Sequence, residues 1–198
     1  MTVSEVSEPA PPPPLPFRMP CADDDLAGCT TGCADKQPED CVTLGAIYLS
    51  GAVAGVDVTR AVVLLRAACL EGSARGCLKL GDALHAGLTR GDDAEEIDCY
   101  RRACDGGANL GCLAAGHAYL SGHGVGADPV FAAALFRKVC EKGNAHACFE
   151  LGRLFKAGEG VPRSADSATD MFTKACELGL DQGCLAVSRK GELSSPRE

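Results

Sequence analysis

Cysteine is the residue type in this chain whose spacing could support chemistry, through disulfide bonds, thiolate reactions or metal binding. Thirteen of the 198 residues are cysteine, and ten of them form five pairs with the spacing C-x7-C. The first cysteines of successive pairs are 36, 35, 36 and 36 residues apart. One spacing on one period predicts an internal repeat with one disulfide per repeat, which is a scaffold rather than a reaction centre. The pairs are Cys33 with Cys41, Cys69 with Cys77, Cys104 with Cys112, Cys140 with Cys148, and Cys176 with Cys184.

Three cysteines, Cys21, Cys29 and Cys99, lie outside these pairs. Because thirteen is odd, at least one thiol stays unpaired within the monomer, and we expect it to be Cys99 in a core position. Cys21 and Cys29 are also separated by C-x7-C, but out of phase. A helix would hold their Cα atoms about 12 Å apart, beyond the reach of a disulfide at about 7 Å. A bond between them therefore requires a non-helical N-terminal segment, and both outcomes stay open.

A four-thiolate zinc site built from Cys21, Cys29, Cys33 and Cys41 is a further alternative. The spacing lacks the usual C-x2-C knuckles, and two of these residues already belong to the repeat. The four histidines show no metal-ligand spacing either, so the sequence predicts no metal site and no cofactor. They are His85, His117, His123 and His146.

Each repeat is predicted to contain two helices that meet at the cysteines. Apolar residues at i, i+3, i+4 and i+7 mark the helix before the first cysteine, as in Ala132, Leu135, Phe136 and Val139. The corresponding set in the preceding repeat begins with Glu96. The second cysteine opens the next helix, and a glycine follows four residues later in four repeats. Glycine inside a helix costs about 1 kcal/mol relative to alanine, so these residues predict close helix–helix approach. They are Gly45, Gly81, Gly116 and Gly152.

The repeats define one all-α domain, an α/α-repeat solenoid over residues 21–192 with about five helix pairs and degenerate ends. Residues 1–20 are predicted to form a disordered proline-rich linker, and residues 193–198 a disordered tail. Hydrophobic residues make up 46% of the chain but aromatic residues only 5%. Small core side chains bury little apolar area, and each disulfide is expected to offset this by adding roughly 2–3 kcal/mol to the free energy of unfolding.

Charge and hydropathy exclude two classes of partner. The formal net charge of −8 argues against nucleic acid, whose phosphates require a strongly basic face. No apolar run approaches the roughly 18 residues of a membrane span.

Cysteine usage favours an oxidising compartment, periplasmic or extracellular. Residues 1–20 lack the apolar segment of a signal peptide, so we expect an upstream start, with unconventional export or reduced cysteines as alternatives.

From Ala132 to Val161 a C-x7-C pair, an LG dipeptide, an aromatic residue and a terminal glycine follow one another, and they recur in phase elsewhere. Over residues 25–190 this pattern resembles the Sel1-like repeat family, especially its disulfide-rich Helicobacter cysteine-rich branch. The resemblance implies a right-handed, tetratricopeptide-like superhelix with a disulfide in each helix pair, and a role in protein interaction. Some members bind or slowly hydrolyse β-lactams. A mitochondrial intermembrane-space branch, linked to cytochrome oxidase assembly, supplies an alternative location.

The predicted function is non-catalytic binding of a protein or peptide along the inner surface. The chain contains no S-x-x-K, no G-x-S-x-G and no phosphate-binding loop, and no serine is accompanied by an activating base. Two alternatives from other classes rest on the resemblance. One is penicillin-binding or weak β-lactamase-like activity, and the other is a redox or metalloenzyme assembly factor that uses the spare thiols.

Arg66, Arg101 and Arg137 occupy one repeat position, three residues before the cysteine. Stacked repeats should align them at intervals of about 10 Å, and we call them the arginine row. A neighbouring basic position has acidic residues at i+3, but the arginine row has no such consistent set. The row therefore predicts an acidic peptide or protein segment as ligand, the alternative being a solvated helix face.

Turnover of β-lactams is expected to be absent or very slow, because no serine nucleophile has a base beside it. Nitrocefin hydrolysis by the purified, oxidised protein measures this. Efficient hydrolysis that follows the protein through every purification step would overturn the non-catalytic interpretation.

Overall fold

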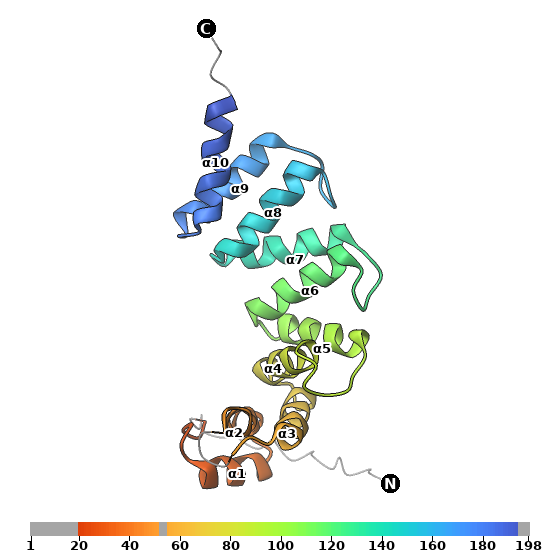
Figure 1. Cartoon of the computed structure of the whole chain (residues 1–198), viewed down its shortest axis with the longest axis vertical. Helices are drawn as coiled ribbons and strands as arrows, with labels where there is room; N and C mark the ends of the chain where they lie inside the picture. The colour runs from red at the N-terminus through yellow and green to blue at the C-terminus, as the bar shows by residue number, and fades with distance from the viewer. Residues whose placement is uncertain (1–19, 52–54, 194–198) are drawn as a thin grey trace, which may run out of the picture.

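The structure is a computed structural model that describes residues 20–51 and 55–193. These residues form ten helices and no strand, which confirms the predicted all-α repeat class. Figure 1 shows the helices stacked along one long axis, from α1 at one end to α10 at the other. The helices are α1 (Leu26–Ala34), α2 (Pro38–Ser50), α3 (Val58–Leu70), α4 (Ala74–His85), α5 (Asp93–Asp105), α6 (Asn109–Ser121), α7 (Pro129–Glu141), α8 (Ala145–Ala157), α9 (Ala165–Glu177) and α10 (Asp181–Leu193).

The predicted terminal segments lie almost entirely outside the described residues. Of the predicted linker over residues 1–20, only Pro20 is described. Of the predicted tail over residues 193–198, only Leu193 is described, and it ends α10 rather than beginning a tail. None of the described helices is both long and apolar enough to cross a membrane.

The helix boundaries differ from prediction at the second cysteine of each pair, because these cysteines lie inside the even-numbered helices rather than opening them. Helix α4 begins at Ala74, three residues before Cys77, and α8 begins at the corresponding place. In α4 and α8 a side-chain cap, which the cysteine spacing does not reveal, fixes this start, whereas α2 and α6 begin at the same place without a side-chain cap. Ser73 accepts a hydrogen bond from the Gly76 amide, and Asn144 caps α8 in the same way. The other second cysteines, which likewise follow the start of their helix by three residues, are Cys41, Cys112, Cys148 and Cys184.

Each predicted C-x7-C pair forms a disulfide that joins the end of an odd-numbered helix to the start of the next even-numbered helix. The paired Cα atoms lie between 4.4 and 4.7 Å apart. A helix that continued unbroken would hold them about 12 Å apart, so the turn between the two helices is what permits the bond. The bonds join Cys33 to Cys41, Cys69 to Cys77, Cys104 to Cys112, Cys140 to Cys148, and Cys176 to Cys184.

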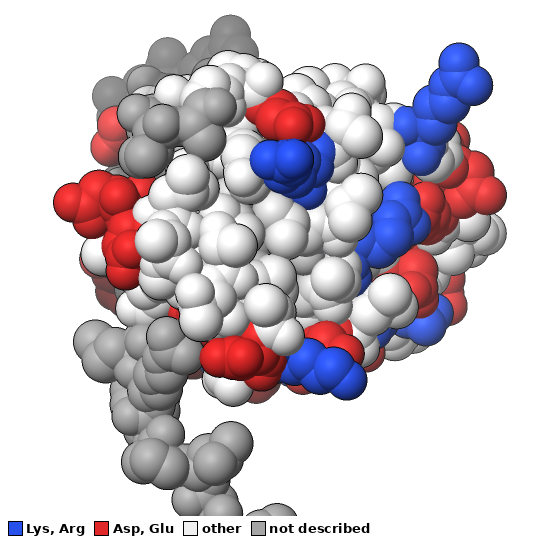
Figure 2. Space-filling model, turned by 90° about the horizontal axis from the view of Figure 1, so that it is seen from below, with Lys and Arg blue, Asp and Glu red and all other residues white. Residues whose placement is uncertain are grey.

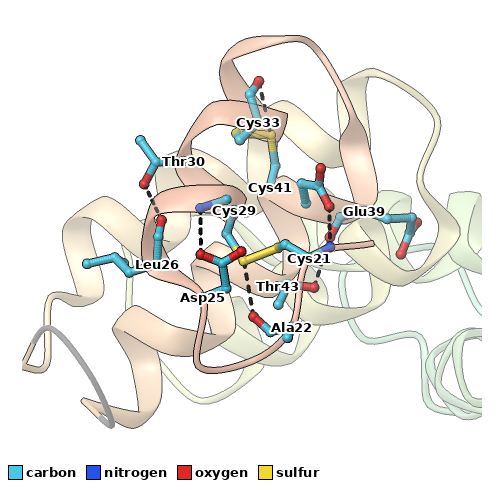
Figure 3. Close-up of a disulfide and its surroundings, with 12 residues drawn as sticks. Cys21, Ala22, Asp25, Leu26, Cys29, Thr30, Cys33, Glu39, Cys41 and Thr43 are labelled. Atoms are coloured by element: carbon cyan, nitrogen blue, oxygen red, sulfur yellow. Dashed lines mark hydrogen bonds between the residues drawn. A yellow bond between two sulfur atoms is a disulfide. The ribbon is translucent and has the colours of Figure 1, made fainter. Parts of the chain in front are cut away.

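A sixth disulfide joins Cys21 to Cys29, with their Cα atoms 5.1 Å apart (Figure 3). Helix α1 begins only at Leu26, so Cys21 lies in the non-helical segment that this bond requires. The Cys21 amide also donates to the buried Asp40 carboxylate at 2.7 Å. The four-thiolate zinc alternative is therefore wrong, because all four of its cysteines are in disulfides. Cys21 and Cys29 are likewise not unpaired, and Cys99 is the free thiol of the described residues.

The in-register glycines face large buried side chains of the following helix. A Cβ atom built on Gly116 would lie 2.7 Å from the Phe136 ring, closer than real Cβ atoms approach other groups. The same collision arises between Gly81 and Tyr100 at 2.8 Å and between Gly152 and Phe172 at 2.7 Å. The predicted close helix–helix approach is confirmed. Three of the four glycines lie directly against an aromatic ring, and a Cβ atom on Gly45 would lie 3.1 Å from the Leu65 side chain.

Replacing Gly152 by valine should lower the free energy of unfolding by about 1–3 kcal/mol, because the new side chain collides with the Phe172 ring. The matched control is Gly126→Val in a loop, where a Cβ would have no neighbour within 4 Å. Urea unfolding of the oxidised variants measures both values. Equal stability of the two variants would show that the ring contact does not limit the packing.

Candidate functional site

A hollow of about 420 Å³ opens between α4, α5 and α6, and it collects three of the four histidines. Its floor is apolar and includes the buried Tyr100, whose pKa is raised by burial and by the neighbouring Asp82 and Glu96 carboxylates. We call it the histidine hollow. It is lined by His85, Glu96, Ile97, Tyr100, Ala114, His117, Ala118, Ser121 and His123.

Glu96 is the central polar group of this hollow. The residue is 7% exposed, and its Oε1 atom lies 2.9 Å from Nδ1 of His85. Its Oε2 atom lies 4.0 Å from Nε2 of His123, which is also 3.7 Å from Oδ1 of Asp93. One ligand atom each from Asp93, Glu96 and His123 lie within 4.8 Å of one another. The sequence predicts no metal site here, but the structure brings together a donor set that could hold one.

The repeat itself shows that Glu96 is unusual. The equivalent positions in the other repeats are Ala61, Ala132 and Ala168, which are 0%, 0% and 3% exposed. A carboxylate in a buried alanine position loses hydration, and it is stable there only when charged or polar partners surround it. His85 and His123 supply such partners from the preceding and following turns of the solenoid.

The loop after α6 places His123 against the start of α5. Gly124 has a φ of 63°, a conformation that favours glycine. A Cβ atom built there would lie 2.3 Å from the backbone oxygen of Asp93. The bare backbone of Gly124 therefore allows the loop to come close enough for His123 to reach the two carboxylates.

A second hollow, of about 660 Å³, lies between α8, α9 and α10. Phe149 and Phe172 lie against each other in its wall, with ring centroids 5.4 Å apart. We call it the basic hollow, because Arg153, Lys156 and Arg163 line it and no Asp or Glu does so among the described residues. Arg153 also contacts Glu150 at 3.0 Å, outside the lining. The remaining lining residues are Ala157, Gln182, Leu185 and Ala186.

The arginine row carries more internal pairing than the sequence pattern indicates. Arg66 forms an ion pair with Glu95 of the next repeat, and Arg101 contacts Asp98 at 3.2 Å. Arg137 lines a smaller hollow of about 260 Å³ together with Glu141 and Asp170. Arg66 and Arg101 thus already have carboxylate neighbours, Glu95 and Asp98 respectively, and both of these carboxylates belong to α5.

Charges of both signs are interspersed over the part of the surface shown in Figure 2. Acidic and basic side chains both lie around the rim of this view, and uncharged residues cover much of its centre.

Arg102, from the basic position next to the arginine row, donates to the Cys69 carbonyl oxygen at 2.8 Å. It therefore helps to satisfy the C-terminal end of α3.

Comparison with known families identifies the repeat. The family model described as Sel1 repeat matches residues 41–73, 74–107, 109–144 and 145–180, which together exceed half of the chain. The chain belongs to the Sel1 repeat family. A search of curated protein sequences found no significant match.

Solved structures of other Sel1 repeat proteins share the fold. The protective antigen c5321 of uropathogenic Escherichia coli, described as displaying an SLR fold, aligns with a TM-score of 0.80 and 22% identity over 87% of this chain. This chain spans 38% of that antigen's length. A Sel1 repeat protein from Oxalobacter formigenes aligns with a TM-score of 0.74 and 23% identity, over 89% of this chain and 72% of its own.

The Helicobacter pylori cysteine-rich protein B aligns with 28% identity and a TM-score of 0.52, over 68% of this chain and 97% of its own. This likeness, with a disulfide that links each matched Sel1 repeat to the next, confirms the resemblance to the cysteine-rich branch.

The free thiol lies in the same Sel1 repeat as Glu96. Cys99 is 4% exposed, and burial raises the pKa of its thiol to about 11, with a further contribution from Glu95 and Asp98. A redox role requires an accessible thiolate, so this environment disfavours the assembly-factor alternative.

Ser73 lies 2.5 Å from a Glu39 oxygen, but it is buried and caps α4, so this serine–carboxylate pair is structural.

Native Cys99 should react with iodoacetamide at pH 8 about a hundredfold more slowly than in the unfolded oxidised chain, because its thiolate is scarce. The rate should rise with pH towards about 11, since the thiolate fraction grows up to the raised pKa. Mass spectrometry of the labelled peptide measures both rates. Rapid labelling of the native protein at pH 8 would contradict this account of Cys99.

Proposed function

We propose that this chain is a non-catalytic scaffold that binds an acidic segment of a protein partner, and that the segment docks in the basic hollow. The observation that carries the proposal is the lining of that hollow. Two phenylalanine rings lie beside three cationic side chains, with no carboxylate among the described lining residues.

The chemistry of this lining suits a peptide in which acidic and apolar side chains alternate. Arginine guanidinium groups bind carboxylates through paired hydrogen bonds, and Lys156 adds a point charge. Phe149 is half-buried, so an apolar ligand side chain would gain contact area on its exposed part, and the buried Phe172 ring packs behind it. The net charge of −8 makes this local basic surface selective, because an acidic ligand is repelled elsewhere.

The arginine row remains a second place where the same ligand could dock. Binding there would require the ligand to displace Glu95 from Arg66 and Asp98 from Arg101. This competition costs the ligand part of its charge-assisted hydrogen bonding at two of the three arginines. In the basic hollow only Arg153 has such a partner among the described ion pairs, Glu150, so we favour the basic hollow.

The proposed location is an oxidising compartment, periplasmic or extracellular, with the mitochondrial intermembrane space as the alternative. Six disulfides in the described residues support it, since thiols in the cytosol are kept reduced.

A peptide array that varies the content of Asp, Glu and aromatic residues would select a ligand, and fluorescence anisotropy would then measure its Kd. The triple variant R153A/K156A/R163A should weaken binding at least about tenfold, as expected from losing roughly 1.4 kcal/mol of charge-assisted contact. Added salt should weaken binding to the unaltered chain.

The matched control is R66A/R101A/R137A, which removes the same number of positive charges from the arginine row. It should change the Kd less than about threefold, a difference of well under 1.4 kcal/mol. Circular dichroism establishes that both variants are folded. A loss of affinity in the row variant alone would move the site to the arginine row, and unchanged affinity in both would overturn the proposal.

A further inference from the structure

The buried carboxylate of the histidine hollow has no role in the peptide-binding proposal. Three repeats bury alanine where this repeat buries Glu96, so the scaffold packs without a carboxylate there. Placing an ionisable group at such a position is destabilising unless something binds it. Its Oε1 atom is held by His85 at 2.9 Å, while its Oε2 atom faces His123 at 4.0 Å.

The separations around His123 suit a shared ligand better than direct contact. Distances of 3.7 Å to Asp93 and 4.0 Å to Glu96 are too long for hydrogen bonds. Two ligand atoms bound to one tetrahedral zinc ion at about 2.1 Å lie about 3.4 Å apart. Small side-chain rotations would therefore bring all three donor atoms onto one ion.

We propose that Asp93, Glu96 and His123 bind a divalent transition-metal ion of the zinc class. The imidazole favours zinc, cobalt or nickel over calcium and magnesium, which prefer oxygen ligands throughout. His85 is a positioning residue, because its hydrogen bond to Oε1 holds the other oxygen of Glu96 towards His123.

The neighbouring groups define which side chains are available to the ion. Asp92 caps α5 and Glu95 pairs with Arg66, so Asp93 and Glu96 are the acids of this helix end that remain for the ion. Asp93 is exposed and His123 lies on a loop, so the ion can enter from solvent. The close seating of Gly124 on the backbone of Asp93 fixes the loop that presents His123.

Isothermal titration of the oxidised full chain with Zn²⁺, in a Cys99→Ala background that removes the thiol, tests the proposal. One equivalent should bind, and Mg²⁺ at the same concentration should give no binding. Glu96→Ala should abolish the one-equivalent binding yet remain folded, because it restores the alanine of the other repeats. His123→Ala, on the loop, should do the same.

Two further variants separate positioning from general surface binding. His85→Ala should weaken Zn²⁺ binding about 10- to 100-fold and shift the visible absorption of the Co²⁺ complex, while the stoichiometry stays at one. His146→Ala, an exposed histidine outside the hollow, should leave the affinity unchanged. Absence of Zn²⁺ binding, or binding that survives both Glu96→Ala and His123→Ala, would overturn the proposal.

Discussion

Every junction between neighbouring helices from α1 to α10 depends on one of two close contacts. A disulfide fixes each odd-numbered helix to the next even-numbered one, and a backbone glycine against a large side chain fixes each even-numbered helix to the next odd-numbered one. Aromatic residues are scarce, but three of them lie at such junctions, packed against a glycine: Tyr100, Phe136 and Phe172. The alternation lets a core of small side chains hold an extended stack.

Because the scaffold repeats, a residue that departs from the repeat is informative. Ala61, Ala132 and Ala168 show what packing alone requires at one position, and Glu96 shows what one repeat adds to it. The two larger hollows make the same point. Tyr100 and Phe172 occupy equivalent positions in their walls, yet one hollow gathers histidines and a carboxylate, and the other gathers cations. Equivalent backbone geometry therefore presents different chemistry along one solenoid.

Residues outside the repeating pattern shape the N-terminal end of the stack. The Cys21–Cys29 bond ties the segment before α1 to α1 itself (Figure 3). The buried Asp40 ties the same segment to α2, because its carboxylate accepts from the Cys21 amide. Gly32 lies directly against Asp40, where a Cβ atom would collide with the carboxylate. The first helix thus covers the end of the stack with these polar contacts added to the disulfide and apolar packing that the interior repeats also use.

The sequence by itself determined the repeat, the all-α class, the five in-phase disulfides and the close approach at Gly116 and its equivalents, because each follows from local periodicity. It left the Cys21–Cys29 bond open, since the bond depends on where α1 begins. It also missed the meeting of His123 with Glu96 and the pairing of Arg66 with Glu95. Those contacts join different repeats, and the path of the loop at Gly124 and the rotation between helices decide them, so only the tertiary structure could show them.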